Sequence, residues 1–273
     1  PDPEAAINAV VAAVRSGRIT PKRLNESVMR LLQAKARLGL ASKRLVDLNR
    51  IHEVVSAPES VSLAQQISDK SVTLVKNDGA LVPLRTPAST AFVILAESRT
   101  GVEGQAFALE LRRRAANAIV IQVDQTMSDA DLDAAVQHAS QASQYVIAAF
   151  ASVAAYRGNV ALGGGLPQLV QKLVATRKPV AFVSLGNPYL LRAFPDVNAY
   201  LTTYSSVPDS EVSVVKALFG EIPIAGKLPV TIPGLAKYGD GIEVDRQASG
   251  PATVGSLSPD QLTKPSVSTP AHR

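Results

Sequence analysis

Six short apolar runs, none alternating strictly with polar residues, constrain the fold of this chain more than any other feature. They are separated by segments of helical period and lie at residues 71–77, 91–96, 118–123, 145–151, 180–186 and 199–204. A strand that is apolar on both sides is buried on both faces of its sheet. The pattern therefore predicts a mostly parallel six-stranded sheet with helices on both faces, a doubly wound, flavodoxin-like α/β sandwich.

Five helices are expected around these strands, at about 59–69, 103–116, 129–142, 165–176 and 209–219. The third has the clearest start, because Ser128 can cap it and Asp131 follows three residues later. In the connections between the expected strands and helices, the sequence also predicts that Asp124 caps the turn at 124–128 and that Asn187 and Pro188 begin a helix.

The first fifty residues predict two amphipathic helices, the second capped by Thr20 before Pro21 and stopped by Gly39. Apolar residues recur at helical spacing at Ile7, Val10, Val11 and Val14, and again at Leu24, Val28, Leu31 and Leu32. Two such helices have little of their own to bury, so we expect them to pack on another surface. We divide the chain into these helices and a linker (1–57), the sandwich (58–236) and a flexible tail rich in Ser and Pro (237–273).

Composition excludes several classes of protein. The first fifty residues carry ten Lys and Arg against four Asp and Glu, but no aromatic residue occurs before Phe92, so we expect no nucleic-acid binding. The longest apolar runs are six or seven residues, and a membrane span needs about 20. No targeting segment is visible, and nothing in the sequence assigns a compartment.

The stretch LFGEIPIAGKLPVTIP (218–233) invites comparison with a phosphate-binding loop. That loop needs four residues between its glycines, a hydroxyl residue after the lysine and a helix behind it. Here five residues separate Gly220 from Gly226, Leu228 follows Lys227, and prolines keep the segment extended. We expect instead that Lys227 pairs with a nearby carboxylate or carbonyl group.

Other catalytic patterns are missing, and we expect no metal and no cofactor. The chain has no Cys, and His52, His138 and His272 are dispersed without ligand spacing. Ser184 lies in a strand without the glycines of a nucleophile elbow. The cluster Gly163–Gly165 lacks dinucleotide-binding spacing and is interpreted as a flexible turn.

Ligands of open parallel sheets bind beyond the carboxyl ends of the strands. The polar residues expected there are Glu97, Arg99, Glu103, Asp124, Tyr156, Arg157, Asn159, Asn187, Tyr204, Ser205 and Asp209. The loop 151–165 is too long for a simple connection, so Tyr156, Arg157 and Asn159 are the candidate substrate-proximal residues.

Three segments, in order, resemble glycoside hydrolase family 3. AAINAVVAAVRSGRITPKRLNESVMRLLQAKARLGL is similar to the family's last barrel helix and exit helix, and SDKSVTLVKNDGALVPL to the start of its second domain. SLGNPYLL and AYLTTYSSVPDSEVSVVKALFGEIPIAGKLPVTIP resemble the close of that domain. The short second domain most resembles the bacterial β-N-acetylhexosaminidase branch, with the β-glucosidase branch as the alternative.

The resemblance implies a retaining glycosidase whose nucleophilic Asp lies on a (β/α)₈ barrel that this chain does not contain. In the β-glucosidase branch the second domain supplies a Glu as acid/base, but loop 151–165 holds no carboxylate. No catalytic residue can therefore be placed in this chain, and the partners implied are the catalytic barrel of the same parent protein and, through it, a carbohydrate. A stand-alone binding module and a self-contained flavodoxin-like enzyme remain as alternatives.

Overall fold

A computed structural model describes residues 2–98, 100–151 and 161–247. The chain forms two compact units, Pro1–Val61 and Ser62–Arg273, and each is described by itself.

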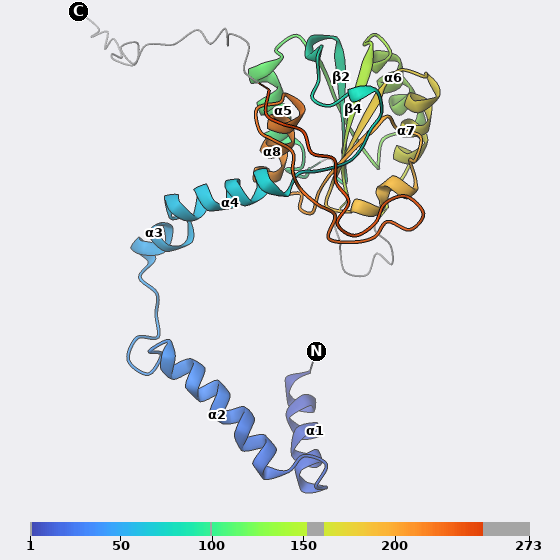
Figure 1. Ribbon diagram of the computed structural model, residues 1–273. Helices are drawn as coiled ribbons and strands as arrows, with labels where there is room; N and C mark the ends of the chain where they lie inside the picture. The colour runs from blue at the N-terminus through green and yellow to red at the C-terminus, as the bar shows by residue number, and fades with distance from the viewer. Residues whose placement is uncertain (1, 99, 152–160, 248–273) are drawn as a thin grey trace, which may run out of the picture. The chain divides into compact units, whose positions relative to one another are not determined.

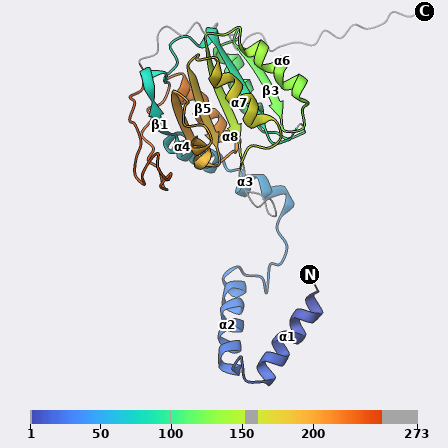
Figure 2. The ribbon, with the colours of Figure 1, turned by 90° about the vertical axis from the view of Figure 1, so that its right-hand side faces the viewer.

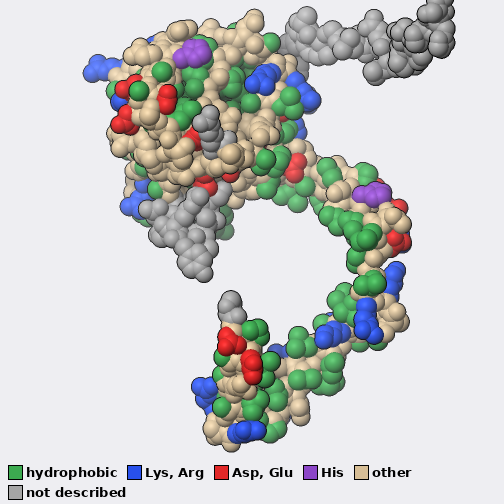
Figure 3. Space-filling model, turned by 180° about the vertical axis from the view of Figure 1, so that it is seen from behind, with side chains coloured by type: hydrophobic (Ala, Val, Ile, Leu, Met, Phe, Trp, Pro, Cys, Tyr) green, Lys and Arg blue, Asp and Glu red, His purple; other side chains and the backbone are tan. Residues whose placement is uncertain are grey.

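The first unit consists of helices joined by turns. It holds α1 (Pro3–Arg15), α2 (Pro21–Arg37), the single turn η1 (Leu48–Arg50) and α3 (Ile51–Val55). The hydroxyl of Thr20 accepts the N–H of Arg23 at 3.2 Å, and Gly39 follows α2 with φ +66°, as predicted. Within α1 and α2, Ala13 is the one buried side chain, so the apolar faces of both helices are exposed (Figure 3).

The second unit contains the predicted six-stranded sheet. Its strands are β1 (Thr73–Asn77), β2 (Thr90–Ala96), β3 (Ile119–Asp124), β4 (Gln144–Phe150), β5 (Val180–Leu185) and β6 (Ala199–Thr203), in the spatial order β1-β6-β5-β4-β2-β3. Neighbouring strands are parallel except β1, which runs antiparallel to β6. The mostly parallel sheet expected from the apolar runs is confirmed.

Helices cover both faces of this sheet, as Figures 1 and 2 show. The helices are α4 (Pro58–Ser71), α5 (Gln105–Arg114), α6 (Asp129–Ala139), α7 (Leu166–Ala175) and α8 (Pro208–Leu218), and short turns lie at η2 (Asp78–Ala80), η3 (Pro87–Ser89) and η4 (Pro188–Arg192). Apolar residues of α5 and α8 pack in one buried cluster, and those of α6 and α7 in the other. Every residue of β2 and β5 is buried, because the two layers cover both sides of each strand.

Hydrogen bonds dock α4 on α8. The Asp69 carboxylate accepts from Ser213 Oγ at 2.7 Å and from Lys216 Nζ at 3.0 Å, and Gln65 donates to Ser213 Oγ at 2.8 Å. Partly buried polar groups on both helices are thereby satisfied.

The first residues of the predicted tail are hydrogen bonded to the sandwich. The N–H of Ile242 donates to Leu74 O at 2.7 Å, beside the outer edge of β1. Ile224 and Val244 exchange two backbone hydrogen bonds of 2.8 and 2.9 Å. Residues 237–247 thus lie against the domain, while 248–273 are outside the described residues; the domain boundary at 236 stays a prediction.

The Phe182 side chain tests how much the aromatic packing stabilises this core. Its ring is fully buried and stacks with Phe194 at 5.2 Å and with Tyr200 at 5.7 Å between centroids. Phe182→Ala should lower the free energy of unfolding by about 3–5 kcal/mol, because it removes a large buried ring and leaves a cavity. Urea unfolding measures this; Tyr238→Ala, at a 74% exposed position, is the control and should change stability by less than about 0.5 kcal/mol.

Candidate functional site

The strand order places a crevice at the carboxyl edge between β2 and β4. From β2 the chain crosses to β3 on one side, and it then returns to β4 on the other side of β2. The connections after β2 and β4 lead to α5 and α7, which lie on opposite faces of the sheet (Figure 1). Such a switch point is where open α/β sheets bind ligands. We therefore take the described residues of the loops that follow β2 and β4, within 97–104 and 161–165, as the candidate site.

Glu211 of α8 reaches the loop after β2 and caps α5. Its carboxylate accepts the N–H groups of Phe107 at 2.8 Å and of Gly104 at 3.3 Å. Because the first amides of a helix have no partner within the helix, this carboxylate satisfies donors that would otherwise be buried and free. A side chain of one helix thus fixes the start of another.

Burial raises the pKa of Glu211 above its ordinary value, although the amide hydrogen bonds oppose that shift. The negative charge of Glu103 raises it further. Glu103 Oε2 is itself buried and has no hydrogen-bond partner among the described residues. The loop after β2 therefore brings two carboxylates close together, and sequence reasoning missed this because Glu103 and Glu211 are far apart in the chain.

Four other polar residues expected at this edge serve the local structure. The Asp124 carboxylate accepts from Thr126 N at 2.8 Å, which confirms the predicted turn. Asn187 Oδ1 accepts from Tyr189 N at 2.9 Å and caps η4, which is a 3₁₀ turn. These two side chains hold turns that the fold itself requires.

Two further residues of this edge also serve the local structure. Tyr204 Oη lies 2.9 Å from Thr73 Oγ1, and Ser205 O accepts from Thr203 Oγ1 at 2.8 Å. Both contacts join neighbouring parts of the sheet and its loops.

The glycine cluster forms a close-packed turn; the turn is as predicted, and its flexibility stays a prediction. A Cβ atom on Gly164 would lie 2.1 Å from the backbone oxygen of Gln125, and Gly164 has φ +55°. One on Gly163 would lie 2.1 Å from Gln125 Oε1, and one on Gly165 2.5 Å from Leu132 Cδ1. The turn needs glycine because it lies directly on the connection between β3 and α6.

The candidate residues Tyr156, Arg157 and Asn159, and also Arg99, lie outside the described residues. Their role at this edge stays a prediction. In the described part of the chain, no group of three or more His, Asp or Glu side chains could hold a metal ion, and no helix there is long and apolar enough to span a membrane.

The segment 218–233 contains no phosphate loop. Lys227 Nζ donates to Gly241 O at 2.9 Å and pairs with Glu243 at 2.8 Å, which confirms the predicted carbonyl and carboxylate partners. This ion pair holds the pKa of the Glu243 carboxyl below its usual value. Gly226 lies against β1: its N–H donates to Val72 O at 3.2 Å, and a Cβ atom there would lie 2.5 Å from Thr73 Oγ1.

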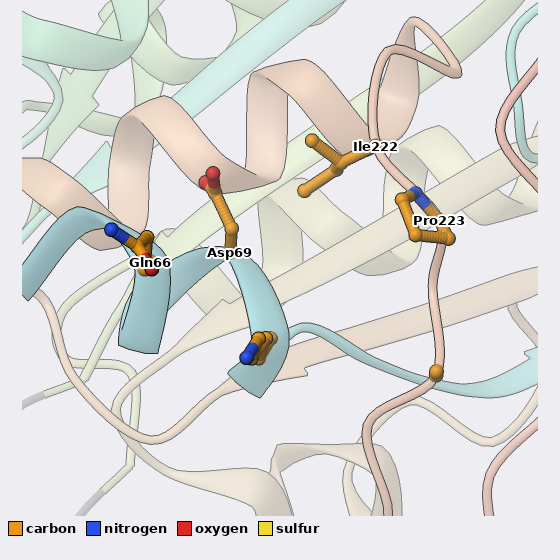
Figure 4. A pocket seen from close by; sticks show the side chains of 6 residues that line it. Gln66, Asp69, Ile222 and Pro223 are labelled. Carbon is orange, nitrogen blue, oxygen red and sulfur yellow. The ribbon is translucent and has the colours of Figure 1, made fainter. Parts of the chain in front are cut away.

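A groove of about 570 Å³ lies between α4 and the segment that follows α8 (Figure 4). Its lining is Gln66, Asp69, Lys70, Ile222, Pro223 and Ala225. Its one carboxylate, Asp69, is already bound to Ser213 and Lys216. The carboxylate of this groove is therefore used to dock α4 on α8.

The fold and its carboxyl edge define the class: an α/β sandwich domain whose described edge residues mainly cap and join its own elements. The sequence profile of the glycosyl hydrolase family 3 C-terminal domain matches residues 72–260. The chain belongs to this family.

Among curated proteins, a beta-N-acetylglucosaminidase/beta-glucosidase of Cellulomonas fimi is 26% identical over 236 residues, covering 80% of this chain and 40% of the relative. A periplasmic beta-glucosidase of Salmonella typhimurium is 23% identical over 269 residues, with 81% and 35% covered. The chain thus spans about two fifths or less of these relatives.

Solved structures give the same picture. A glycoside hydrolase family 3 beta-N-acetylglucosaminidase from Paenibacillus is similar with a TM-score of 0.63 and 26% identity, over 84% of this chain and 43% of that one. A beta-glucosidase from Listeria innocua in complex with glucose has a TM-score of 0.65 at 20% identity, over 82% and 34% of the two chains, and supports the fold alone.

The raised pKa of Glu211 has a consequence for stability. The folded chain binds the proton of the Glu211 carboxyl more tightly than the unfolded chain does. The stability that the protonated Glu211 contributes is therefore present below pH 4.5 and is lost as the pH rises through the raised pKa of the folded state. Compared with Glu211→Gln, which cannot ionise, the wild type should therefore lose free energy of unfolding from about pH 4 to neutral pH. Urea unfolding across this range measures the difference; parallel pH profiles of the two proteins would contradict it.

Proposed function

We propose that this chain is the C-terminal sandwich of a retaining glycoside hydrolase that removes terminal β-N-acetylglucosamine residues. In the full-length protein, called the parent below, it packs on and stabilises a catalytic (β/α)₈ barrel. The barrel carries the nucleophile, and loop 151–165 with Tyr156, Arg157 and Asn159 borders the substrate cleft.

The exposed apolar faces of α1 and α2 are the observation that carries this proposal. Ile7 is 63% exposed and Leu31 is 64% exposed. The side chains of Val28, Met29 and Leu32 are exposed as well. Amphipathic helices gain most of their stability from packing the apolar face on another element. A surface of the parent that buries these apolar faces would explain why they are exposed in the isolated chain. The resemblance of this segment to barrel and exit helices indicates that this surface belongs to the catalytic barrel.

The carboxyl edge supports a role without catalysis for the isolated chain. Glycoside hydrolysis uses two carboxyl groups that flank the scissile bond. Glu211 is 1% exposed and bound to amides of α5, while Asp124 is 4% exposed and holds its own turn. Loop 151–165 carries no Asp or Glu. We therefore expect the pair that performs hydrolysis to lie in the barrel of the parent, as the resemblance implies.

The substrate class rests on two relatives that are named for N-acetylglucosamine chemistry. The β-glucosidase branch is the second candidate, because other similar proteins carry that name. A loop 151–165 without a carboxylate favours the first branch, since the second takes its acid/base from this domain.

Activity assays test this assignment directly. The isolated chain should hydrolyse neither a chromogenic N-acetyl-β-glucosaminide nor the matching β-glucoside, while the parent should hydrolyse the first faster than the second. The parent with its barrel nucleophile replaced is the control for contaminating glycosidases. Turnover by the isolated chain, abolished by a substitution within it, would overturn the proposal, and so would a parent inactive on both substrates.

The apolar face of α2 can be tested by one substitution in two settings. Leu31→Asp should change the free energy of unfolding of the isolated chain by less than about 0.5 kcal/mol, because Leu31 is exposed there. In the parent the same change should cost about 2 kcal/mol or more, because it places a charge at a buried leucine position. Gln33→Asp introduces the same residue on the opposite side of the helix and should have little effect in either protein. Equal effects of Leu31→Asp in the two settings would exclude a partner for this face.

A further inference from the structure

The sheet ends in β1 on one side and in β3 on the other, and these two outer edges differ (Figure 2). Natural sheets avoid joining one another when an outer strand carries a bulge, a lysine or a covering segment. The edge at β1 has all three. Its register shifts between Leu74 and Lys76, Lys76 places a charge on the strand, and Ile242 N donates to Leu74 O at 2.7 Å from outside the sheet. This edge of the sheet is therefore closed.

The edge at β3 has none of these features within the described residues. Its register with β2 is unbroken from Ile119 to Asp124. Residues 119–123 contain no proline and no charged side chain, and no backbone hydrogen bond joins them to a described segment other than β2. The N–H and C=O groups that point away from the neighbouring strand can pair with a further strand. β3 therefore offers an open and regular edge.

The side chains of β3 favour a partner strand that is apolar as well. Ile119 and Ile121 are only partly buried against one apolar cluster, and Val120 is partly buried against the other. Cross-strand pairs of β-branched residues stabilise a sheet. A strand with charged side chains would find no ion-pair partner along 119–123. The strand that suits this edge is short, apolar and uncharged, as β3 itself is.

Charges at the two ends of β3 favour a second copy of β3 as the partner strand. Arg112 and Arg113 are exposed in the last turn of α5, just before β3. Asp129 and Asp131 are exposed in the first turn of α6, just after it. A second β3 that runs antiparallel meets opposite charge at both ends of the edge. The two helices lie on opposite faces of the sheet, so these charges orient the partner through the field at each end rather than as ion pairs.

We propose that two copies of this chain pair antiparallel along β3 and form one continuous sheet, with the two-fold axis at Ile121. In this register Ile119 lies opposite Val123 of the second copy, and Ile121 lies opposite Ile121, all on the face that α6 covers. On the other face, Val120 lies opposite Gln122. Apolar side chains thus oppose apolar side chains on the first face. This inference concerns association alone and does not depend on the proposed function.

Gln122 allows a charge-swap test, because its side chain is exposed and would lie diagonally across from Gln122 of the second copy. Diagonal neighbours in an antiparallel pair are about 7–8 Å apart. Gln122→Lys and Gln122→Glu each place like charges at this distance, so each should raise the dimer Kd about tenfold or more at low salt. An equal mixture of the two variants places opposite charges there, and it should form a heterodimer with a Kd within about threefold of the wild-type value. Sedimentation velocity over a range of protein concentrations measures these constants.

Two control variants separate this edge from other surfaces. Gln171→Lys makes the same change at an exposed position of α7, which connects β4 to β5, and it should leave the dimer Kd unchanged. Leu31→Asp should also leave it unchanged, because the apolar face of α2 is not part of the proposed interface. Three results would each overturn the inference: a wild-type chain that stays monomeric, association that Leu31→Asp weakens and Gln122→Lys does not, or Gln122 variants that fail to associate when mixed.

Hydrogen exchange gives a second readout that needs no substitution. The outward N–H groups of 119–123 should exchange more slowly as the protein concentration rises through the dimer Kd, because they become bonded to the second copy. The strand β5, in the interior of the sheet, should show the same protection at every concentration. Protection of 119–123 that does not change with concentration would mean that another segment of the chain covers this edge, and it would overturn the inference.

Discussion

Burial of one sheet on both faces is the constraint on which the rest of this structure depends. The central strands offer no side on which a polar group could reach water, so polar chemistry is displaced to the strand ends and loops. The same burial requires a layer of helices on each side, which supply two separate apolar clusters. Any site that this domain offers must therefore lie along an edge, and the strand order selects the carboxyl edge between β2 and β4.

At that edge the domain uses most of its described polar groups to hold itself together. Glu211 binds the amides that open α5, and Asp124 and Asn187 hold turns. A carboxylate that accepts backbone N–H groups in a buried place is poorly suited to exchanging protons with a substrate, because its partners fix both its position and its lone pairs. This agrees with membership of a family's C-terminal domain that covers only part of the length of its relatives.

Predictions from the sequence were accurate where the signal was local. The cap at Ser128, the turn at Asp124 and the start of η4 at Asn187 each depend on side-chain bonds to nearby backbone, which a short stretch of sequence encodes. The close packing of Gly163–Gly165 was not predictable, because a glycine that permits motion and one that permits close approach look the same in sequence. Only the position of Gln125, almost forty residues earlier, distinguishes them.

The sequence by itself determined the class of fold, the order of its elements and the rejection of a phosphate loop, because apolar period and residue spacing are properties of the chain alone. The structure decided which distant groups meet. It brought Glu103 beside Glu211, laid Gly226 against β1 and joined Lys227 to Glu243. Each of these contacts joins residues that lie far apart in the chain and meet only in the tertiary structure, so no local pattern records them.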